Sequence, residues 1–335
     1  MENLRLAHKN ASVGKHWYKE VKMVNSDVDY YLTEIQKMLQ NKTYKNSEYE
    51  IFERWEGPKI RKIYKLPYFP DRIIQWALLQ VVGCFIEKQF TKDTYSAIPE
   101  RGPLECMLQL SRDIHIDPEN TIYCLKIDIH HFYQSINHIL LKKKYRRLFK
   151  DNDLLWLIDT IIDSVPENEG IPIGNYTSQY SGNLYLSNFD HWIKEVLHVK
   201  YYYRYMDDMV FLSDNKEFLH DVLDSIQKRL LSVEMLKLKS NYQIFPIADR
   251  GIDYVGFIMY PEYTLIRNRI KMNFITLCEY LWKQDVLTDH YRSALFSYLG
   301  FLQHSNTFNL QYKYYEPIRL KFRLPNMIKT PFSNK

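Results

Sequence analysis

The 335-residue chain contains little cysteine and little glycine, and it has no long apolar run. Its four cysteines, Cys84, Cys106, Cys124 and Cys278, form no C-x-x-C pair, which argues against a zinc knuckle and fits a reducing compartment. The N-terminus lacks the apolar core of a secretory signal, and the longest apolar stretch, "IIQWALLQVVGCFI", is too short to span a bilayer. We therefore predict a cytoplasmic protein without a membrane segment.

Charge of neither sign dominates, because 45 Lys and Arg stand against 40 Asp and Glu, a formal net charge of +5. This excess does not by itself indicate a nucleic-acid-binding protein. The basic residues gather in four segments with interleaved aromatic residues: 9–22, 59–65, 142–147 and 313–323. Such segments can bind phosphates while their rings stack on bases, or they can be solvated faces of helices, and the pattern leaves both interpretations open.

Periodicity along the chain predicts more helices than strands. Helical spacing occurs in residues 25–40, 71–90, 103–115, 137–149, 153–163, 176–198, 216–231 and 271–302. Strand-like runs occur in residues 121–129, 201–206, 209–213 and 253–260. This order predicts an α+β fold with a small antiparallel sheet backed by helices, rather than a doubly wound parallel sheet. The segment after residue 270 has no strand pattern and is predicted to be a helical unit.

Three carboxylates lie at the ends of the predicted strands. Asp207 and Asp208 separate two strand-like runs in "YYYRYMDDMVFLSD", and Asp128 follows the run "CLKI". Ionised carboxylates there are costly unless a cation compensates them, and Mg²⁺ prefers carboxylate oxygens. Two such ions about 4 Å apart serve in-line phosphoryl transfer. Two plainer interpretations remain, a hairpin tip facing water for the pair and a helix N-cap for Asp128.

The wider set of motifs resembles the reverse transcriptases. The segments that carry the resemblance are "LPYFPDRIIQWAL" (66–78), "YSAIPERGPLECML" (95–108), "KIDIHHFYQSI" (126–136), "GIPIGNYTSQYSGNLYL" (170–186), "RYMDDMVFLSD" (204–214) and "RGIDYVGFIMY" (250–260). The resemblance implies a right-hand polymerase: an N-terminal extension with fingers in residues 1–120, a palm in 121–260 that includes fingers residues near 140–180, and a short helical thumb in 261–335.

The resemblance also implies roles for single residues. Asp128, Asp207 and Asp208 match the metal-binding carboxylates, joined by the backbone carbonyl of Ile129, and two Mg²⁺ ions, replaceable by Mn²⁺, are implied as cofactors. The remaining matches are Tyr133 under the sugar of the incoming nucleotide, Arg101 on its triphosphate, and Tyr254, Gly256 and Phe257 in the primer grip. A fixed ring at Tyr133 leaves no room for a 2′-hydroxyl, so the expected product is DNA. A core tyrosine and an ordinary loop arginine are the alternatives for Tyr133 and Arg101.

One motif points to a subclass. Most reverse transcriptases have the pattern Q-G-x-x-x-S-P, whereas this chain has Ile173, Gly174 and Gln179 in the form I-G-x-x-x-S-Q. That form resembles the reverse transcriptases of diversity-generating retroelements, which are bacterial or phage-encoded. Isoleucine replaces a hydrogen-bonding side chain beside the nascent base pair by an apolar contact, so discrimination between nucleotides should weaken. A plain packing role for Ile173 is the alternative.

The subclass implies partners and a biological role. Its members copy a template RNA into cDNA from dNTPs, with errors at template adenines, and the cDNA replaces a variable region of a target gene. They work with a small basic accessory protein that forms a ring-shaped oligomer. Other bacterial reverse transcriptases, of the retron or abortive-infection type, and a non-catalytic RNA-binding scaffold are the competing interpretations. In the segment before the primer grip, Asn241 replaces a lysine available as a general acid, and Lys239 lies two residues away; this role stays unassigned.

Overall fold

A computed structural model describes residues 1–56, 59–165 and 169–328. Residues 329–335, the end of the predicted thumb, lie outside the described range. The helices are α1 (Glu2–Ser12), α2 (Lys19–Ser26), α3 (Val28–Gln40), α4 (Ile73–Glu87), α5 (Pro103–Ile116), α6 (His138–Leu148), α7 (Asn152–Ile162), α8 (Tyr176–Glu195), α9 (Lys216–Ser232), α10 (Ile247–Arg250), α11 (Asn268–Trp282), α12 (Asp289–Leu302) and α13 (Phe308–Phe322).

The strands form three small antiparallel sheets. They are β1 (Glu50–Glu56), β2 (Lys59–Lys65), β3 (Tyr123–Asp128), β4 (Tyr201–Tyr205), β5 (Asp208–Ser213), β6 (Gln243–Pro246), β7 (Ile252–Tyr254), β8 (Phe257–Met259) and β9 (Thr264–Ile266). The central sheet has the order β4-β5-β3-β6, beside a β1-β2 hairpin and a β7-β8-β9 sheet. The predicted α+β class with a small antiparallel sheet backed by helices is confirmed.

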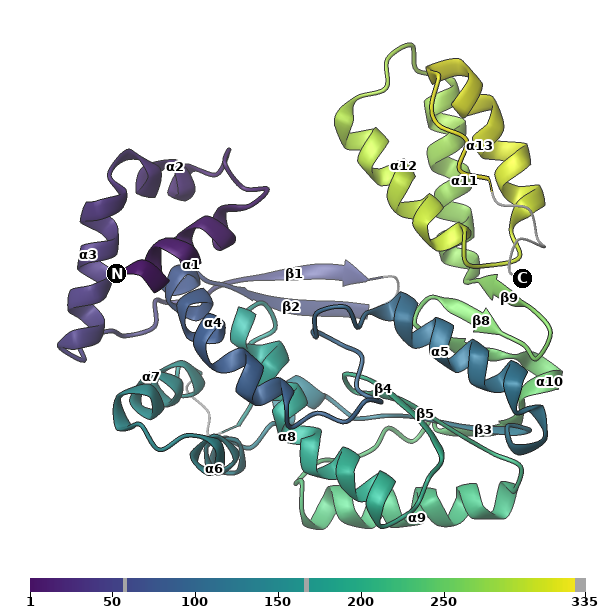
Figure 1. The fold of residues 1–335 in the computed structure, drawn as a ribbon, viewed down its shortest axis with the longest axis horizontal. Coiled ribbons are helices and arrows are strands. Elements are labelled where there is room, and N and C mark those ends of the chain that lie inside the picture. Colours follow the sequence, from purple (N-terminus) through teal and green to yellow (C-terminus); the bar gives the residue numbers. More distant parts are fainter. Residues whose placement is uncertain (57–58, 166–168, 329–335) are drawn as a thin grey trace.

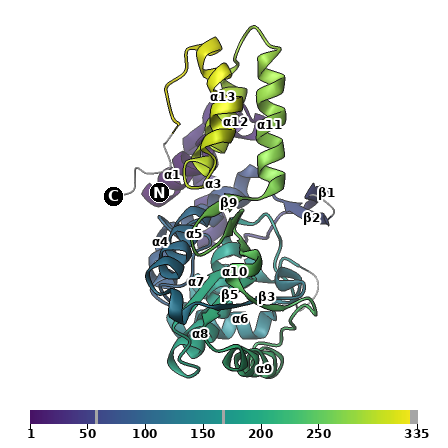
Figure 2. The ribbon, with the colours of Figure 1, turned by 90° about the vertical axis from the view of Figure 1, so that its right-hand side faces the viewer.

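The central sheet is covered on both faces because its side chains alternate in direction along each strand. Leu125 and Ile127 of β3 face the core that includes α8 and α9, while Cys124 faces the core of α5 and the β7-β8-β9 sheet. Figure 1 shows α9 below this sheet and α5 above it, and Figure 2 shows the same order from the side. A charged residue within a sheet so covered needs a partner, as buried charges do.

The two ends of the chain form helical units that flank the sheets. Helix α1 packs on α4, while α11 packs against α12 and α13. In Figure 1 the N-terminal helices lie at the upper left and the C-terminal helices at the upper right, with the β1-β2 hairpin between them. Among the described helices, none combines the length and the apolar character that a membrane span requires.

Two of the predicted elements were wrong in the same way. The predicted helix 271–302 is two helices, because Thr288 caps a new one by accepting a hydrogen bond from the Tyr291 amide. The predicted strand 253–260 is the hairpin β7-β8, which turns at Val255 and Gly256 with φ of 44° and 99°. Positive φ at both turn residues is what a two-residue hairpin requires. A continuous apolar pattern hides such breaks, because it persists through a buried turn.

Candidate active site

The three predicted carboxylates come together at one end of the central sheet. Asp128, the last residue of β3, lies opposite Asp208, the first residue of β5. Met206 and Asp207 form the turn between β4 and β5, and Met206 has a positive φ of 57°. The amide of Ile129 donates to the carbonyl of Asp207 at 3.1 Å, which ties the turn to the end of β3. The pairing of strands thus places the carboxylates side by side.

The pKa values of Asp207 and Asp208 are raised above the ordinary value of an aspartate. Burial raises the pKa of Asp207 to about 6, and the charge of Asp128 adds to the effect. Burial also raises the pKa of Asp208 to about 6, against the opposing charge of Lys126. The environment therefore disfavours a second and third negative charge unless a cation enters. A water-facing hairpin tip does not have this property.

Some carboxylate oxygens in the site have no partner. The Oδ1 atoms of Asp128 and Asp208 are buried and accept no hydrogen bond. Such oxygens suit a divalent cation, which prefers carboxylate ligands. Within the described part of the chain, no three His, Cys, Asp or Glu side chains are arranged as a ready-made metal site. A cation bound here therefore has to take further ligands from water or from substrate phosphates, which is the usual behaviour of Mg²⁺.

Two lysines neutralise the outer oxygens of the carboxylates. Lys239 forms an ion pair with Oδ2 of Asp128, and its amide donates to the Asp128 carbonyl at 2.9 Å. Lys126 lies 3.5 Å from Oδ2 of Asp208. Lys126 precedes Asp128 by two residues, so the two share one face of β3. The two-residue spacing of Lys126 and Asp128 is visible in the sequence and could have assigned Lys126 to the site. Asn241, two residues after Lys239, is exposed.

A fully buried arginine fixes the turn that carries Asp207. Arg204 of β4 has no exposed surface, and its guanidinium donates to the carbonyl of Met206 at 3.0 Å. The same group donates to both carboxylate oxygens of Asp190 on α8, at 2.8 and 2.6 Å, and to the amide oxygen of Asn183 at 3.0 Å. Because every contact is shielded from water, this network ties the catalytic turn rigidly to α8.

Tyr133 lies beside the same turn. It belongs to a short 3₁₀ helix, Phe132–Ser135, and its hydroxyl donates to the sulfur of Met206 at 3.3 Å. The ring also approaches Gly182 of α8, where an added Cβ would lie 3.8 Å from Tyr133 and 3.2 Å from Phe132. Burial raises the pKa of Tyr133, and the charge of Arg61 opposes this shift. Arg61 of β2 therefore lies near the site, although the sequence motifs gave it no role.

The loop with Ile173 and Gly174 joins the β1-β2 hairpin to α8. The amide of Tyr64 donates to the Ile173 carbonyl at 2.8 Å. Gly174 has a φ of 127°, and a Cβ there would lie 2.3 Å from the Tyr64 carbonyl oxygen, so glycine is required for this contact. Ile173 is half-buried, and Gln179 is exposed one turn into α8. The structure thus places Ile173 on the loop and Gln179 on the helix that follows it.

Arg101 lies on the loop before α5, and part of its guanidinium group is hydrogen-bonded to backbone carbonyl groups. Its Nη1 atom donates to the carbonyl of Thr91 at 2.9 Å and more weakly to that of Thr94 at 3.4 Å. Thr94 forms an isolated parallel β-bridge with Arg204, so this loop runs along β4. Within the described part of the chain, the other guanidinium donors of Arg101 form no hydrogen bond. A contact of Arg101 with a triphosphate stays a prediction.

The predicted primer-grip residues lie in the β7-β8 hairpin and point inward. The side chains of Tyr254 and Phe257 are fully buried, and Phe257 stacks on Phe301 of α12 at 5.4 Å. The Tyr254 hydroxyl donates to the carbonyl of Asp208 at 2.7 Å. An added Cβ at Gly256 would lie 3.1 Å from Ile270 of α11. These side chains support the catalytic strand and the helical unit, so a contact with a primer has to come from the hairpin backbone.

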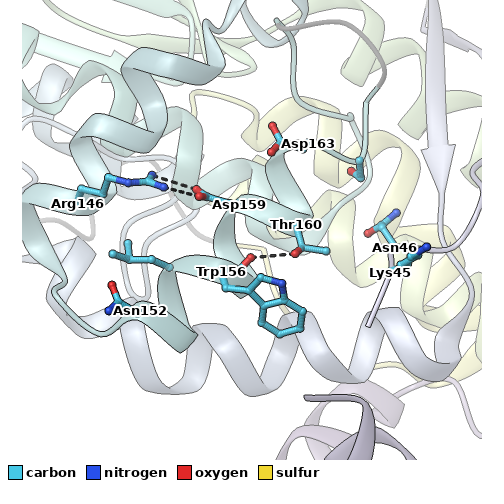
Figure 3. A pocket seen from close by; sticks show the side chains of 10 residues that line it. Lys45, Asn46, Arg146, Asn152, Trp156, Asp159, Thr160 and Asp163 are labelled. Atoms are coloured by element: carbon cyan, nitrogen blue, oxygen red, sulfur yellow. Dashed lines mark hydrogen bonds and ion pairs between the residues drawn. The ribbon is translucent and has the colours of Figure 1, made fainter. Parts of the chain in front are cut away.

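A separate cavity of about 700 Å³ lies away from these residues, between the loop at Lys45 and α7. Figure 3 shows its side chains, with Arg146 pointing at Asp159 and binding both oxygens, and Thr160 bound to the Trp156 carbonyl. None of the predicted catalytic or substrate-binding residues lines it.

The metal-free stability of the chain should depend on pH through Asp207 and Asp208. Their folded pKa is about 6, above the ordinary 3.8, so their contribution is fully present below pH 4 and is lost as the pH rises to 6. We expect the Asp207→Asn, Asp208→Asn variant to melt above the wild type in EDTA, by a margin that grows from about pH 4 to about pH 6 and then levels. A margin independent of pH would contradict this assignment.

The paired carboxylates at the sheet end, the buried network around Arg204 and the loop fixed by Gly174 together form the candidate active site. Residues 56–259 match the profile of the family "Reverse transcriptase (RNA-dependent DNA polymerase)", which is more than half of the chain. The chain belongs to the reverse transcriptase family. The predicted resemblance to reverse transcriptases is confirmed at the level of the family, and the comparison with curated protein sequences found no match.

Solved structures support the fold. Apo telomerase from Candida tropicalis matches with a TM-score of 0.55 and 12% identity, over 90% of this chain and 63% of that one. The C. tropicalis telomerase bound to a fragment of telomeric RNA matches at 0.53 and 12% identity, over 87% and 58%. The Candida albicans complex matches at 0.52 and 10%, over 87% and 62%. The chain thus spans about 60% of the length of these telomerases, with which it shares the right-hand fold.

Proposed function

We propose that this chain is the reverse transcriptase of a diversity-generating retroelement, which copies a template RNA into error-prone cDNA for mutagenic retrohoming into a variable gene. The observation that carries catalysis is the meeting of Asp128, Asp207 and Asp208 with two buried, unpartnered oxygens. The subclass rests on the motif around Ile173. A retron-type or abortive-infection-type enzyme would have the same carboxylates, and a non-catalytic scaffold would have no need of such oxygens.

We propose that Asp128, Asp207, Asp208 and the Ile129 carbonyl hold two Mg²⁺ ions, with Mn²⁺ as a substitute. When bound, these ions would activate the primer hydroxyl and hold the leaving oxygen. The protein's own part is positioning. Arg204 fixes the turn with Asp207, and Lys126 and Lys239 restrain the outer carboxylate oxygens.

Further residues would bind the substrates. The remaining donors of Arg101, together with Arg61, would contact the triphosphate, since guanidinium groups bind phosphates in a bidentate way. Tyr133 would lie under the sugar, and Ile173, Gly174 and Gln179 would border the nascent pair. The hairpin at Tyr254, Gly256 and Phe257 would hold the primer through its backbone.

These roles fit the predicted division of the chain. Residues 1–120 would form the N-terminal extension and most of the fingers, residues 121–260 the palm, and residues 261–335 the thumb. A basic oligomeric accessory protein would assist binding of the template RNA, because the net charge of +5 is small for a polymerase acting alone. The described cysteines are all free thiols, which suits a cytoplasmic site of action.

Primer extension on an RNA template with Mg²⁺ and dNTPs tests the proposal, with products sequenced opposite each template base. DNA product with errors concentrated opposite adenine would support the retroelement class. Accurate product would support a retron-like enzyme instead. No product, even with the accessory protein and cognate RNA, would leave the scaffold interpretation.

Replacement of Tyr133 by alanine should admit ribonucleotides. The ring is held by the Met206 contact and by Gly182, so its removal opens space for a 2′-hydroxyl without disturbing the carboxylates. We expect the ratio of kcat/KM for dNTP over that for rNTP to fall at least about tenfold, which corresponds to about 1.4 kcal/mol. Tyr133→Phe keeps the ring and should keep the ratio. Equal ratios in the alanine variant and the wild type would show that another group excludes the 2′-hydroxyl.

Replacement of Ile173 by glutamine should raise fidelity. The glutamine restores a side chain that can hydrogen-bond beside the nascent pair, on a loop whose backbone is already fixed by Tyr64. Sequencing of cDNA should show an error rate opposite adenine several-fold below that of the wild type. Ile173→Leu, which stays apolar, is the matched control. Identical error spectra in all three forms would assign the infidelity to other residues.

A further inference from the structure

Two cations lie at the junction of the N-terminal helices and the fingers, and neither forms an ion pair with a carboxylate of the described residues. Arg72 ends the helical turn Tyr68–Arg72, donates to the Gly174 carbonyl at 3.3 Å, and lies over the Tyr176 ring at 5.5 Å. Lys15 lies in the loop between α1 and α2, close enough to Arg72 for that charge to lower the Lys15 pKa, after a larger effect of burial. Burial also lowers the pKa of Arg72.

The neighbouring acidic residues accept hydrogen bonds from other groups. Glu20 of α2 accepts the amide of Tyr68, and Asp71 accepts the hydroxyl of Tyr44 at 2.7 Å. In the described part of the chain, no carboxylate contributes to the pKa shift of Lys15 or Arg72. This differs from the catalytic site, where Lys126 and Lys239 each face an aspartate. Two partly buried like charges without a counter-ion are unfavourable, and an anionic ligand would relieve them.

The position of the pair is fixed by the structure around it. His8 of α1 is hydrogen-bonded through Nδ1 to the Tyr68 hydroxyl at 2.7 Å, and α2 contacts the Tyr68–Arg72 turn. These contacts hold the loop with Lys15 against the turn with Arg72. A lysine and an arginine held together are a good phosphate site, since Arg supplies a planar fork of donors and Lys a point charge.

Aromatic residues follow Lys15 in the sequence, and the ring of Tyr176 contacts Arg72. Trp17 and Tyr18 are 66% and 48% exposed and contact each other edge to face at 5.7 Å. On the other side, Trp76 stacks on Tyr176 at 4.4 Å, and its indole Nε1 is a buried donor without a partner. Basic groups that bind the backbone beside rings that accept bases are typical of sites for single-stranded nucleic acid. The chemistry therefore favours a strand over a free inorganic anion.

We propose that Lys15 and Arg72 form a phosphate-binding site for the single-stranded template ahead of the copied position. The site adjoins the catalytic pocket through Gly174, because Arg72 binds the same loop that Tyr64 holds on its other side. The inference rests on the proposed polymerase function and adds to it a binding role for the N-terminal helices. The triphosphate of the incoming nucleotide presents the same chemistry, so the test has to separate the two sources of phosphate.

Fluorescence anisotropy in EDTA measures binding without catalysis. The probe is a DNA primer annealed to an RNA template with a ten-nucleotide 5′ overhang, compared with the same duplex without an overhang. We expect Lys15→Gln and Arg72→Gln each to raise Kd for the overhang probe about three- to tenfold. Each should also lower the slope of log K against log salt by about 0.7, the value for one single-strand phosphate contact. Lys228→Gln, an exposed lysine on α9, is the matched control.

Further measurements make each outcome decisive. Lys15 is in a loop at the surface, so its variant should fold even if Arg72→Gln does not, and melting temperatures check both. An unchanged Kd with a raised KM for dNTP would assign the site to the triphosphate and overturn the template assignment. Unchanged Kd and KM in active variants would overturn the inference alone. A wild-type chain that neither binds nor extends any template would overturn the proposed function together with it.

Discussion

Replacing Arg204 by methionine should destabilise the chain by about 3–5 kcal/mol and slow nucleotide addition about 100-fold. The stability loss arises because Asp190 is left as a buried charge without its partner. The rate loss arises because the Met206 carbonyl loses its donor and the turn with Asp207 is released, and a displacement of about 1 Å at a reacting group has a cost of this size. Urea unfolding and single-turnover kinetics measure the two effects separately.

The double variant Arg204→Met, Asp190→Leu separates folding from positioning. Removing both charges should recover most of the stability, since apolar groups can replace a buried ion pair at little cost. It should not recover the rate, because nothing then holds the turn. Arg146→Met, in the exposed pair with Asp159, is the matched control and should change stability by less than about 1 kcal/mol. Recovery of both quantities in the double variant would mean that the pair only supports the fold.

Replacing Asp207 or Asp208 by asparagine should reduce kcat at least about 1000-fold, equivalent to about 4 kcal/mol of transition-state stabilisation. Asparagine preserves shape but removes the charge that these crowded carboxylates would direct at a cation. Primer–template Kd should not change, because the residues act on the reacting groups. Asp214→Asn, at the far end of the same hairpin and exposed, should leave kcat intact. Activity retained in the Asp207 variant would remove it from the catalytic set.

The sequence predicted that Asp128, Asp207 and Asp208 lie at strand ends, and the structure places them there. Strand ends are visible in the sequence where an apolar run stops at a charge, as it does at Asp128 and on both sides of the Asp207–Asp208 pair. Antiparallel pairing then brings those ends together without any further information. Most of the predicted helices are present because each buries an apolar face, whereas α1, most of α2 and α13 were not predicted as individual helices.

Other parts of the site gave little signal. The β1-β2 hairpin was missed because its described residues are largely exposed on both faces, so no apolar alternation marks it as a strand pair. Arg61 therefore appeared only as one member of a basic segment. Arg204 was given no role from the sequence, because its partners Asp190 and Asn183 lie on α8 and a single sequence does not reveal such a contact.

Through Tyr254 and Gly256, the β7-β8 hairpin connects the strand that begins at Asp208 with the C-terminal helices. The Tyr254 hydroxyl donates a hydrogen bond to the Asp208 carbonyl of β5. Gly256 packs against Ile270 and Phe301 of the C-terminal helices. A displacement at one end of this hairpin therefore acts on the residues at its other end. Under the proposed function, a displacement of those helices by the growing duplex would act on the backbone of Asp208, so the product already made would influence the geometry of the next addition.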